Sequence, residues 1–127
     1  MSKLIHYQLS TQILGMAFRV HKEMGPGLLE SAYEGGMCVE LTYAGIQFER
    51  QQVYPLVYRN EYVGAYIADL VVGNSIILEL KSVKALNEVM EAQIINYLRL
   101  SKLQVGYLLN FSGIRVEWKR FVNLGSG

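Results

Sequence analysis

Residues 68–82, ADLVVGNSIILELKS, decide the fold that we predict for this chain. The stretch is rich in Val, Ile and Leu and is interrupted by Gly73-Asn74-Ser75, a combination typical of two strands joined by a tight turn. Asp69, Glu79 and Lys81 are charged residues within these apolar strands. Side chains alternate between the faces of a strand, so Glu79 and Lys81 share one face. Because a buried carboxylate needs a cation or a hydrogen-bond donor, we interpret this group as a metal site with a catalytic lysine.

The length of the connecting turn decides whether the two acids can meet. A two-residue turn would place Asp69 opposite Leu78 and send Glu79 to the other side of the sheet. If Ser75 also belongs to the loop, or if a bulge interrupts the ladder, Asp69 lies opposite Glu79. The metal-site interpretation therefore requires the longer loop or the bulge. The alternative to a metal site is that Glu79 and Lys81 form a salt-bridged ladder on a solvated sheet face.

The composition is that of a globular domain. A chain of 127 residues can bury a core without disulfides, and we expect residues 1–127 to form one domain with its core over about 10–123. Hydrophobic residues make up 51% and charged residues 18%, which excludes a disordered chain. The net charge of +1 indicates no particular partner, so any nucleic-acid surface must be a local patch.

Cysteine usage and hydropathy bear on the compartment. Cys38 is the single cysteine, which rules out an internal disulfide and fits a reducing compartment. Residues 1–10 contain no apolar region of a signal peptide, and no apolar run approaches the ~20 residues of a membrane span. We therefore expect a cytoplasmic protein without a membrane partner, in which Cys38 is a buried packing residue.

Hydrophobic periodicity and chain breakers predict the order α-α-β-β-β-α-β-β. Ser10 is expected to cap the first helix, and Pro55 marks a bend or an edge strand. A helix connects the strand that carries Glu79 to the strand over 104–111, so these two strands should be parallel neighbours through a right-handed crossover. The predicted fold is α/β, a mixed central sheet flanked by helices. The predicted elements cover residues 10–24, 28–44, 46–58, 62–72, 75–82, 86–102, 104–111 and 114–122.

Glu30 is a carboxylate on a helix face that is otherwise apolar. On the helical wheel it shares this flank with Tyr33, Met37 and Leu41. A first-turn carboxylate can interact favourably with the helix dipole, which is one explanation. Alternatively, Glu30 supplies a further ligand, directly or through water, to a metal held by the strands.

Gln93 holds a comparable position on the third helix. We expect it at the centre of the inward face, one turn before Tyr97. A buried amide must find hydrogen-bond partners. Gln93 is then either a core glutamine bonded to loop backbone or a site residue that orients a water or a phosphate, with Tyr97 supporting it. The other residues of this predicted inward face are Leu86, Val89, Met90 and Leu100.

These polar residues define one chemistry if the fold brings them together. Asp69 and Glu79, with the carbonyl of Leu80, offer hard oxygen ligands that suit Mg²⁺ or Mn²⁺. A metal in such a site makes a water a usable nucleophile and stabilises developing phosphate charge. Lys81 would position or activate that water, or stabilise the transition state.

Asp69, followed by Glu79-Leu80-Lys81, resembles the D…ExK signature of the PD-(D/E)xK nuclease superfamily. Residues 27–33, GLLESAY, are similar to the motif of the GxxExxY family, a small branch of that superfamily. The resemblance spans residues 13–123, nearly the whole chain. It extends to GIQFERQ (45–51), EAQIINYL (91–98) and GYLLNF (106–111).

The resemblance implies a restriction-endonuclease-like core and a Mg²⁺-dependent phosphodiesterase site, in which Mn²⁺ can substitute. Gln93-x-x-x-Tyr97 also resembles the QxxxY motif of the exonuclease-related branch. One departure is that the family's strand often carries an arginine just before the acid, whereas Tyr66-Ile67-Ala68 precedes Asp69 here, which could weaken a phosphate contact. The resemblance implies Asp69 and Glu79 as metal ligands, and Lys81, Glu30, Gln93 and Tyr97 as catalytic residues.

Three functional hypotheses follow from the sequence. The first is a divalent-metal-dependent nuclease whose partner is nucleic acid, DNA before RNA. The second is a non-catalytic nucleic-acid or protein binding module on a nuclease fold, although such a module has no need of Asp69, Glu79 and Lys81 together. The third is a structural or oligomeric protein with an interface on the strands over 104–111 and 114–122. A homodimer would suit cleavage of two strands or of a junction.

Overall fold

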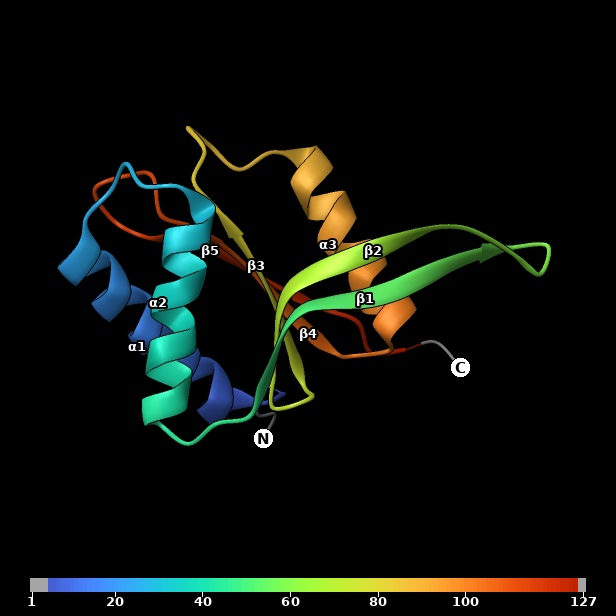
Figure 1. Ribbon diagram of the computed structural model, residues 1–127, viewed down its shortest axis with the longest axis horizontal. Helices are drawn as coiled ribbons and strands as arrows, with labels where there is room; N and C mark the ends of the chain where they lie inside the picture. The colour runs from blue at the N-terminus through green and yellow to red at the C-terminus, as the bar shows by residue number, and fades with distance from the viewer. Residues whose placement is uncertain (1–4, 126–127) are drawn as a thin grey trace.

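The computed structural model describes residues 5–125 and confirms the predicted order of elements (Figure 1). Residues 1–4, part of the N-terminal segment for which no signal peptide is predicted, lie outside the described residues. No helix in the described part of the chain combines the length and apolarity of a membrane span. The elements are α1 (Tyr7–Met24), α2 (Glu30–Tyr43), β1 (Phe48–Tyr58), β2 (Glu61–Val72), β3 (Ile76–Lys81), α3 (Glu88–Ser101), β4 (Val105–Asn110) and β5 (Glu117–Val122).

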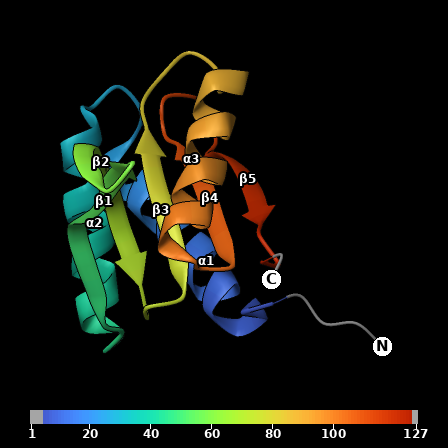
Figure 2. The same ribbon diagram turned by 90° about the vertical axis from the view of Figure 1, so that its right-hand side faces the viewer.

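One five-stranded mixed sheet, in the order β1-β2-β3-β4-β5, forms the centre of the molecule. β1, β2 and β3 form an antiparallel meander, β3 and β4 are parallel, and β5 returns antiparallel to β4 at the edge. The crossover from β3 to β4 passes through α3, as predicted. Figure 2 shows α3 in front of the sheet, with α1 and α2 behind it. The mixed sheet flanked by helices is therefore confirmed.

Each face of the sheet has its own apolar cluster. On the face covered by α1 and α2, the side chains of Leu70, Leu78 and Leu109 pack with both helices, and Cys38 is buried there as expected. On the other face, Val71 and Ile77 pack with residues of α3. Both faces of β3 and β4 are covered, so the two strands are largely apolar. The exceptions with charged or amide side chains are Glu79 and Lys81 in β3 and Asn110 in β4.

The turn between β2 and β3 has the length that the metal-site interpretation requires. Val72 pairs with Ile76, so Gly73, Asn74 and Ser75 form a three-residue loop. Gly73 and Asn74 have φ values of 57° and 51°, in the left-handed region that Gly and Asn tolerate best. The N–H of Ser75 donates to the carbonyl of Val72 at 3.0 Å and closes the loop. The next residues in this register, Asp69 and Glu79, therefore face each other.

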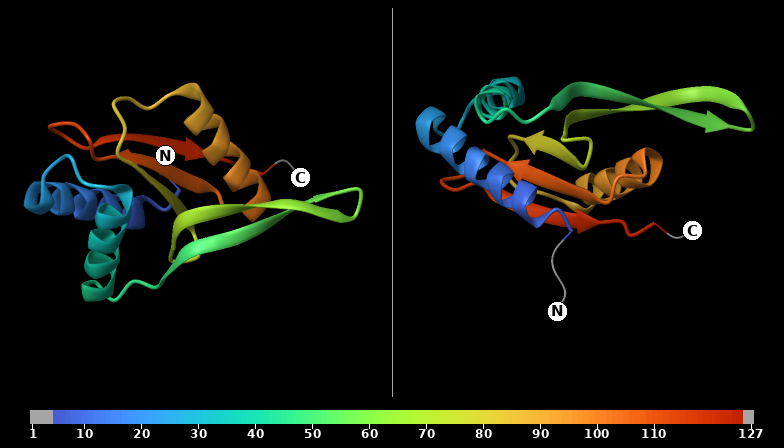
Figure 3. Two further views of the ribbon diagram at one scale, coloured as in Figure 1. Left: turned by 45° about the horizontal axis from the view of Figure 1, so that its top comes forward. Right: turned by 90° about the horizontal axis from the view of Figure 1, so that it is seen from below.

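β1 and β2 continue beyond the body of the molecule as a two-stranded arm (Figures 1 and 3). Arg59 and Asn60 form its tip, both with positive φ, which is typical of a tight hairpin turn. Pro55 lies in β1, the edge strand, as predicted. The arm begins where β2 leaves β3, so Asp69 lies at its base.

Two local predictions on the helices are wrong. α1 begins at Tyr7, so Ser10 is an interior, buried residue that accepts a hydrogen bond from Arg120 Nη1 at 3.2 Å instead of capping the helix. On α3, Val89 is 67% exposed and Leu100 is 37% exposed. Tyr97 is buried as predicted, and the other buried residues of α3 are Ile94 and Leu98.

Gly106 in β4 explains which face of α3 is buried. A Cβ at Gly106 would lie 2.9 Å from Cδ1 of Ile94 and 3.4 Å from Cδ2 of Leu98. The missing side chain lets the helix approach the sheet closely at these two residues. The hydrophobic pattern of the helix alone does not contain this constraint, which comes from another element. Gln93, next to Ile94, is thereby turned to solvent.

Candidate active site

The candidate active site lies where β2 and β3 separate. Backbone pairing between the two strands ends at Leu70 and Leu78. Beyond that point the backbone N–H of Asp69 donates to Oε2 of Glu79 at 3.0 Å, and the N–H of Leu80 donates to Oδ2 of Asp69 at 2.8 Å. Each carboxylate thus binds the backbone of the opposite strand. The two acids that the sequence singled out meet at one place.

Burial makes the ionised form of both acids unfavourable. Glu79 is only 5% exposed, and desolvation, followed by repulsion from Asp69, raises the pKa of Glu79 to about 8. Desolvation also raises the pKa of Asp69, while the hydrogen bond from Leu80 opposes the shift. The positive charge of Lys81 lowers the pKa of both acids. Two desolvated carboxylates side by side would be relieved by a further cation.

The donor set fits a hard divalent cation. Successive carbonyls of a strand point to opposite sides, and the Lys81 carbonyl accepts from the N–H of Phe111 at 2.9 Å. The Leu80 carbonyl therefore points to the side of Asp69. Within residues 5–125 no three His, Cys, Asp or Glu side chains form a complete ligand cluster. Mg²⁺ characteristically keeps several waters and takes one or two carboxylates, so Asp69, Glu79 and the Leu80 carbonyl match its requirements.

We expect the metal-free protein to lose stability as the pH rises from about 5 to about 8. Glu79 releases its proton near its ordinary value of 4.5 when unfolded, but its folded pKa is about 8. Between these values the folded state holds more protons, so the free energy of unfolding falls with pH by at most about 1.4 kcal/mol per unit. Urea unfolding in EDTA should show this slope in wild type and a smaller slope in Glu79→Gln. Equal slopes in wild type and Glu79→Gln, with exposed Glu23→Gln as control, would contradict it.

Lys81 and Glu30 come to this site from two directions. Lys81 ends β3 and, two residues after Glu79, projects from the same face. Glu30 is the first residue of α2, and its Oε2 accepts the N–H of Ser82 at 3.3 Å. The hydroxyl of Ser82 donates to the Leu28 carbonyl at 2.8 Å, which attaches the start of α2 to the end of β3. Glu30 is thus exposed beside the acid pair, and its charge contributes to the raised pKa of Glu79.

Tyr97 borders the site, but the position predicted for Gln93 is wrong. The Tyr97 ring meets Tyr66 edge-on, with centroids 4.3 Å apart. Desolvation and the charge of Glu79 raise the pKa of Tyr97 to about 12. Gln93 is exposed rather than at the centre of a buried face. Because α3 runs antiparallel to β3, Gln93 lies one turn nearer than Tyr97 to the sheet end at Lys81.

Glu34, Arg50 and Gln51 belong to the same region and were missed from the sequence. Glu34 is 8% exposed, and its Oε2 lies 3.0 Å from both Nε and Nη2 of Arg50. Nε2 of Gln51 donates to Oε1 of Glu34 at 2.8 Å and lies 3.5 Å from Oδ1 of Asp69. One signal was present, since Glu34 follows Glu30 by four residues and therefore shares its side of α2.

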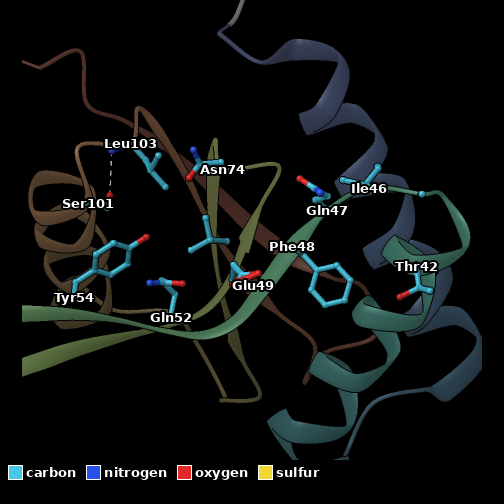
Figure 4. Close-up of a pocket in the computed structure, with 12 residues that line it drawn as sticks. Thr42, Ile46, Gln47, Phe48, Glu49, Gln52, Tyr54, Asn74, Ser101 and Leu103 are labelled. Carbon is cyan, nitrogen blue, oxygen red and sulfur yellow. Dashed lines mark hydrogen bonds between the residues drawn. The ribbon is translucent and has the colours of Figure 1, made fainter.

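A cavity of about 800 Å³ lies elsewhere on the molecule (Figure 4). Thr42 near the end of α2, Asn74 in the β2–β3 turn and Ser101 at the end of α3 line it. The lining contains neither Asp69 nor Glu79, so the chemistry of the acid pair does not take place there. The remaining lining residues are Gly45, Ile46, Gln47, Phe48, Glu49, Gln52, Tyr54, Val71 and Leu103.

Comparison with known proteins connects this geometry to a family. The sequence matches the family model of the PD-(D/E)XK nuclease superfamily over residues 7–121. No curated protein matches the sequence. A mixed sheet with two acids and a lysine where two strands separate defines a nuclease-like α/β protein. The chain belongs to the PD-(D/E)XK nuclease superfamily.

The similarity to one solved structure supports the fold. The crystal structure of SSO0001 is similar with a TM-score of 0.57 and 16% identity, covering 73% of this chain and 49% of that chain. This chain therefore spans about half the length of SSO0001. LHK-Exo in complex with dAMP gives a TM-score of 0.49 at 8% identity, covering 90% of this chain and 82% of that chain. The alkaline exonuclease LHK-Exo from Laribacter hongkongensis gives 0.43 at 10% identity, covering 97% and 72%.

Proposed function

We propose that the protein is a Mg²⁺-dependent nuclease that hydrolyses phosphodiester bonds of DNA, and that it belongs to the GxxExxY branch of its superfamily. The observation that carries the proposal is the meeting of Asp69 and Glu79, each bound to the backbone of the other's strand. Desolvation and the neighbouring charge of Asp69 raise the pKa of Glu79 to about 8, although the positive charge of Lys81 lowers it. A bound divalent cation would supply further positive charge.

Asp69, Glu79 and the carbonyl of Leu80 would hold the metal. When bound, Mg²⁺ lowers the pKa of a coordinated water and stabilises charge on the phosphate oxygens. The hydrogen bonds from the Leu80 and Asp69 N–H groups hold the two carboxylates in place before the metal arrives. Such preorganisation reduces the reorganisation that the site needs on binding.

Lys81 provides a positive charge at the site, which lowers the pKa of both acids. Its ammonium group can donate to the attacking water or to a non-bridging phosphate oxygen, on the same side as Glu79. Glu30, whose Oε2 accepts the N–H of the next residue, Ser82, can accept a hydrogen bond from the water and so orient it for attack. Both groups act on the water or the phosphate directly, and therefore count as catalytic residues in this proposal.

Tyr97 and Gln93 would act from α3. Tyr97 borders Glu79, and its hydroxyl, with a pKa of about 12, is protonated at neutral pH and can donate a hydrogen bond. Gln93 is exposed one turn nearer the end of β3, where its amide can contact the phosphate of a bound strand. The exposure of Gln93 favours a substrate contact over a role in the core.

The test combines metal binding with cleavage. Calorimetric titration with Mn²⁺ should show binding by wild type and by the exposed-acid control Glu23→Gln, and none by Asp69→Ala. Labelled single-stranded, duplex and branched DNA should give Mg²⁺-dependent cleavage products with wild type and Glu23→Gln, and none with Asp69→Ala. RNA of the same sequence is tested in parallel to compare the two kinds of nucleic acid. If Asp69→Ala binds Mn²⁺ as wild type does, the proposed metal site is wrong. Nucleic-acid binding by wild type without cleavage would favour the binding-module hypothesis.

A further inference from the structure

Gln51 adopts an unusual backbone conformation for a strand residue. Its φ is 51°, whereas its neighbours Arg50 and Gln52 pair regularly with Leu70 and Ala68 of β2. Non-glycine residues rarely occupy the left-handed region, and they persist there only where the surrounding structure holds them. A glutamine has none of the local hydrogen bonding that helps Asn or Asp in this conformation. The interior of β1 therefore contains strain at one residue opposite Asp69.

This conformation brings the Gln51 amide between two carboxylates. Its Nε2 lies 2.8 Å from Oε1 of Glu34 and 3.5 Å from Oδ1 of Asp69. A side-chain amide has two N–H hydrogens on one nitrogen, and both neighbours are acceptors, so the NH₂ end can serve both. Oδ2 of Asp69 already accepts the N–H of Leu80 at 2.8 Å. The Leu80 N–H and, at the long end of hydrogen-bonding distance, the Gln51 amide therefore contact one oxygen each of the Asp69 carboxylate and restrain its plane.

Glu34 holds the other side of the amide. Its Oε2 is occupied by the Arg50 guanidinium, with both contacts at 3.0 Å, which leaves Oε1 for Gln51. The ion pair connects α2 to β1 and balances the charge of a carboxylate that is 8% exposed. Gln51 is therefore held by a fixed acceptor on α2 while it contacts Asp69 on β2.

We infer that Gln51 is a positioning residue that orients the Asp69 carboxylate for the metal, and that its strained backbone is retained for this purpose. The inference rests on the proposed function. Side chains that orient a metal ligand contribute to metal affinity although they do not touch the metal. The alternative is that Gln51 only joins α2 to β1, in which case its loss affects stability alone.

Gln51→Gly and Gln51→Ala separate the two explanations. Both variants lack the amide, but only glycine is free of the penalty for a positive φ. In EDTA the thermal midpoint of Gln51→Gly should stay near wild type, because strain relief opposes the lost hydrogen bond to Glu34. Gln51→Ala should unfold several degrees lower. For a positioning role, both should raise the Kd for Mn²⁺ equally, by about 10–100-fold.

Cleavage kinetics give a second readout. At saturating metal, kcat of both variants should fall by about 10–100-fold, while KM for the oligonucleotide stays unchanged. Gln52→Ala is the matched control, because the Gln52 amide lies 3.5 Å from the neighbouring Val53 carbonyl and should leave metal affinity and kcat as in wild type. If the role of Gln51 is purely structural, Mn²⁺ affinity should follow the thermal midpoints. Gln51→Ala should then bind Mn²⁺ more weakly than Gln51→Gly.

Two failures are distinguishable. If wild type binds Mn²⁺ and cleaves DNA while Gln51→Gly keeps wild-type Kd and kcat, the positioning role is wrong and the proposed function stands. If the affinities of the two variants follow their stabilities, the positioning role is equally wrong. If wild type itself neither binds Mn²⁺ nor cleaves, the proposed function is wrong, and this inference is overturned with it.

Discussion

Replacing Lys81 with methionine is expected to lower the rate of DNA cleavage by about 10²–10³-fold, the loss typical of removing one transition-state donor. Methionine keeps the length and apolar character of the side chain, so the packing at the end of β3 is preserved. The Kd for Mn²⁺ should not increase, because removal of a positive charge beside Asp69 and Glu79 leaves their attraction for a cation intact or stronger. Single-turnover cleavage together with calorimetry measures both quantities.

Lys22→Met is the control for this experiment. Lys22 is exposed near the end of α1, and its replacement should change neither cleavage nor metal affinity. If Lys81→Met cleaved at the wild-type rate, the assignment of Lys81 as the catalytic lysine would be wrong. If it lost metal binding and cleavage together, Lys81 would instead support the conformation of the acid pair.

Phe111→Ala is expected to lower the free energy of unfolding by about 3–5 kcal/mol, a large fraction of the stability of a domain this size. Phe111 is fully buried directly after β4, and its ring stacks on Tyr33 of α2 with centroids 4.5 Å apart. The Tyr33 hydroxyl donates to the Gly25 carbonyl at 2.6 Å and accepts the Leu28 N–H at 3.1 Å. The substitution therefore removes support for the segment that leads into Glu30.

Urea unfolding of Phe111→Ala beside Phe18→Ala measures this effect. Phe18 is 47% exposed on α1, and its replacement should cost about 1 kcal/mol or less. Near-equal losses in the two variants would show that the Tyr33–Phe111 stack does not contribute as expected. A reduced cleavage rate in Phe111→Ala under conditions where it is fully folded would indicate that Glu30 has lost its position.

The sequence predicted the order of elements and the pairing of β2 with β3 because these depend on local patterns. Side chains alternate between the two faces of the strands over 68–82, and Gly73 and Asn74 mark the turn between them. The register of these strands therefore depended on one unknown, the length of the turn. The structure determines it, with Val72 paired to Ile76. The inward face of α3 was mispredicted because Gly106, on a different element, determines which helix residues approach the sheet.

The residues of the candidate site could be found from the sequence only where a local pattern reveals them. Asp69, Glu79 and Lys81 stand out as charges in apolar strands, so the pattern of those strands reveals them. Gln51 does not stand out, because nothing adjacent to it in sequence requires a positive φ. Its role depends on Glu34, which lies 17 residues away in sequence and meets it only through the packing of α2 against β1. Contacts of this kind arise only from tertiary packing.

Asp69, held by the Leu80 N–H and contacted by the Gln51 amide, is the only aspartate in the chain. A protein grown with aspartate enriched in ¹³C at the side-chain carboxyl would therefore give a single resonance for that residue type, without any need for assignment. Its chemical shift and its broadening by a paramagnetic ion would follow the occupancy of this one carboxylate in solution. The composition of the chain thus provides a spectroscopic reporter at the base of the arm.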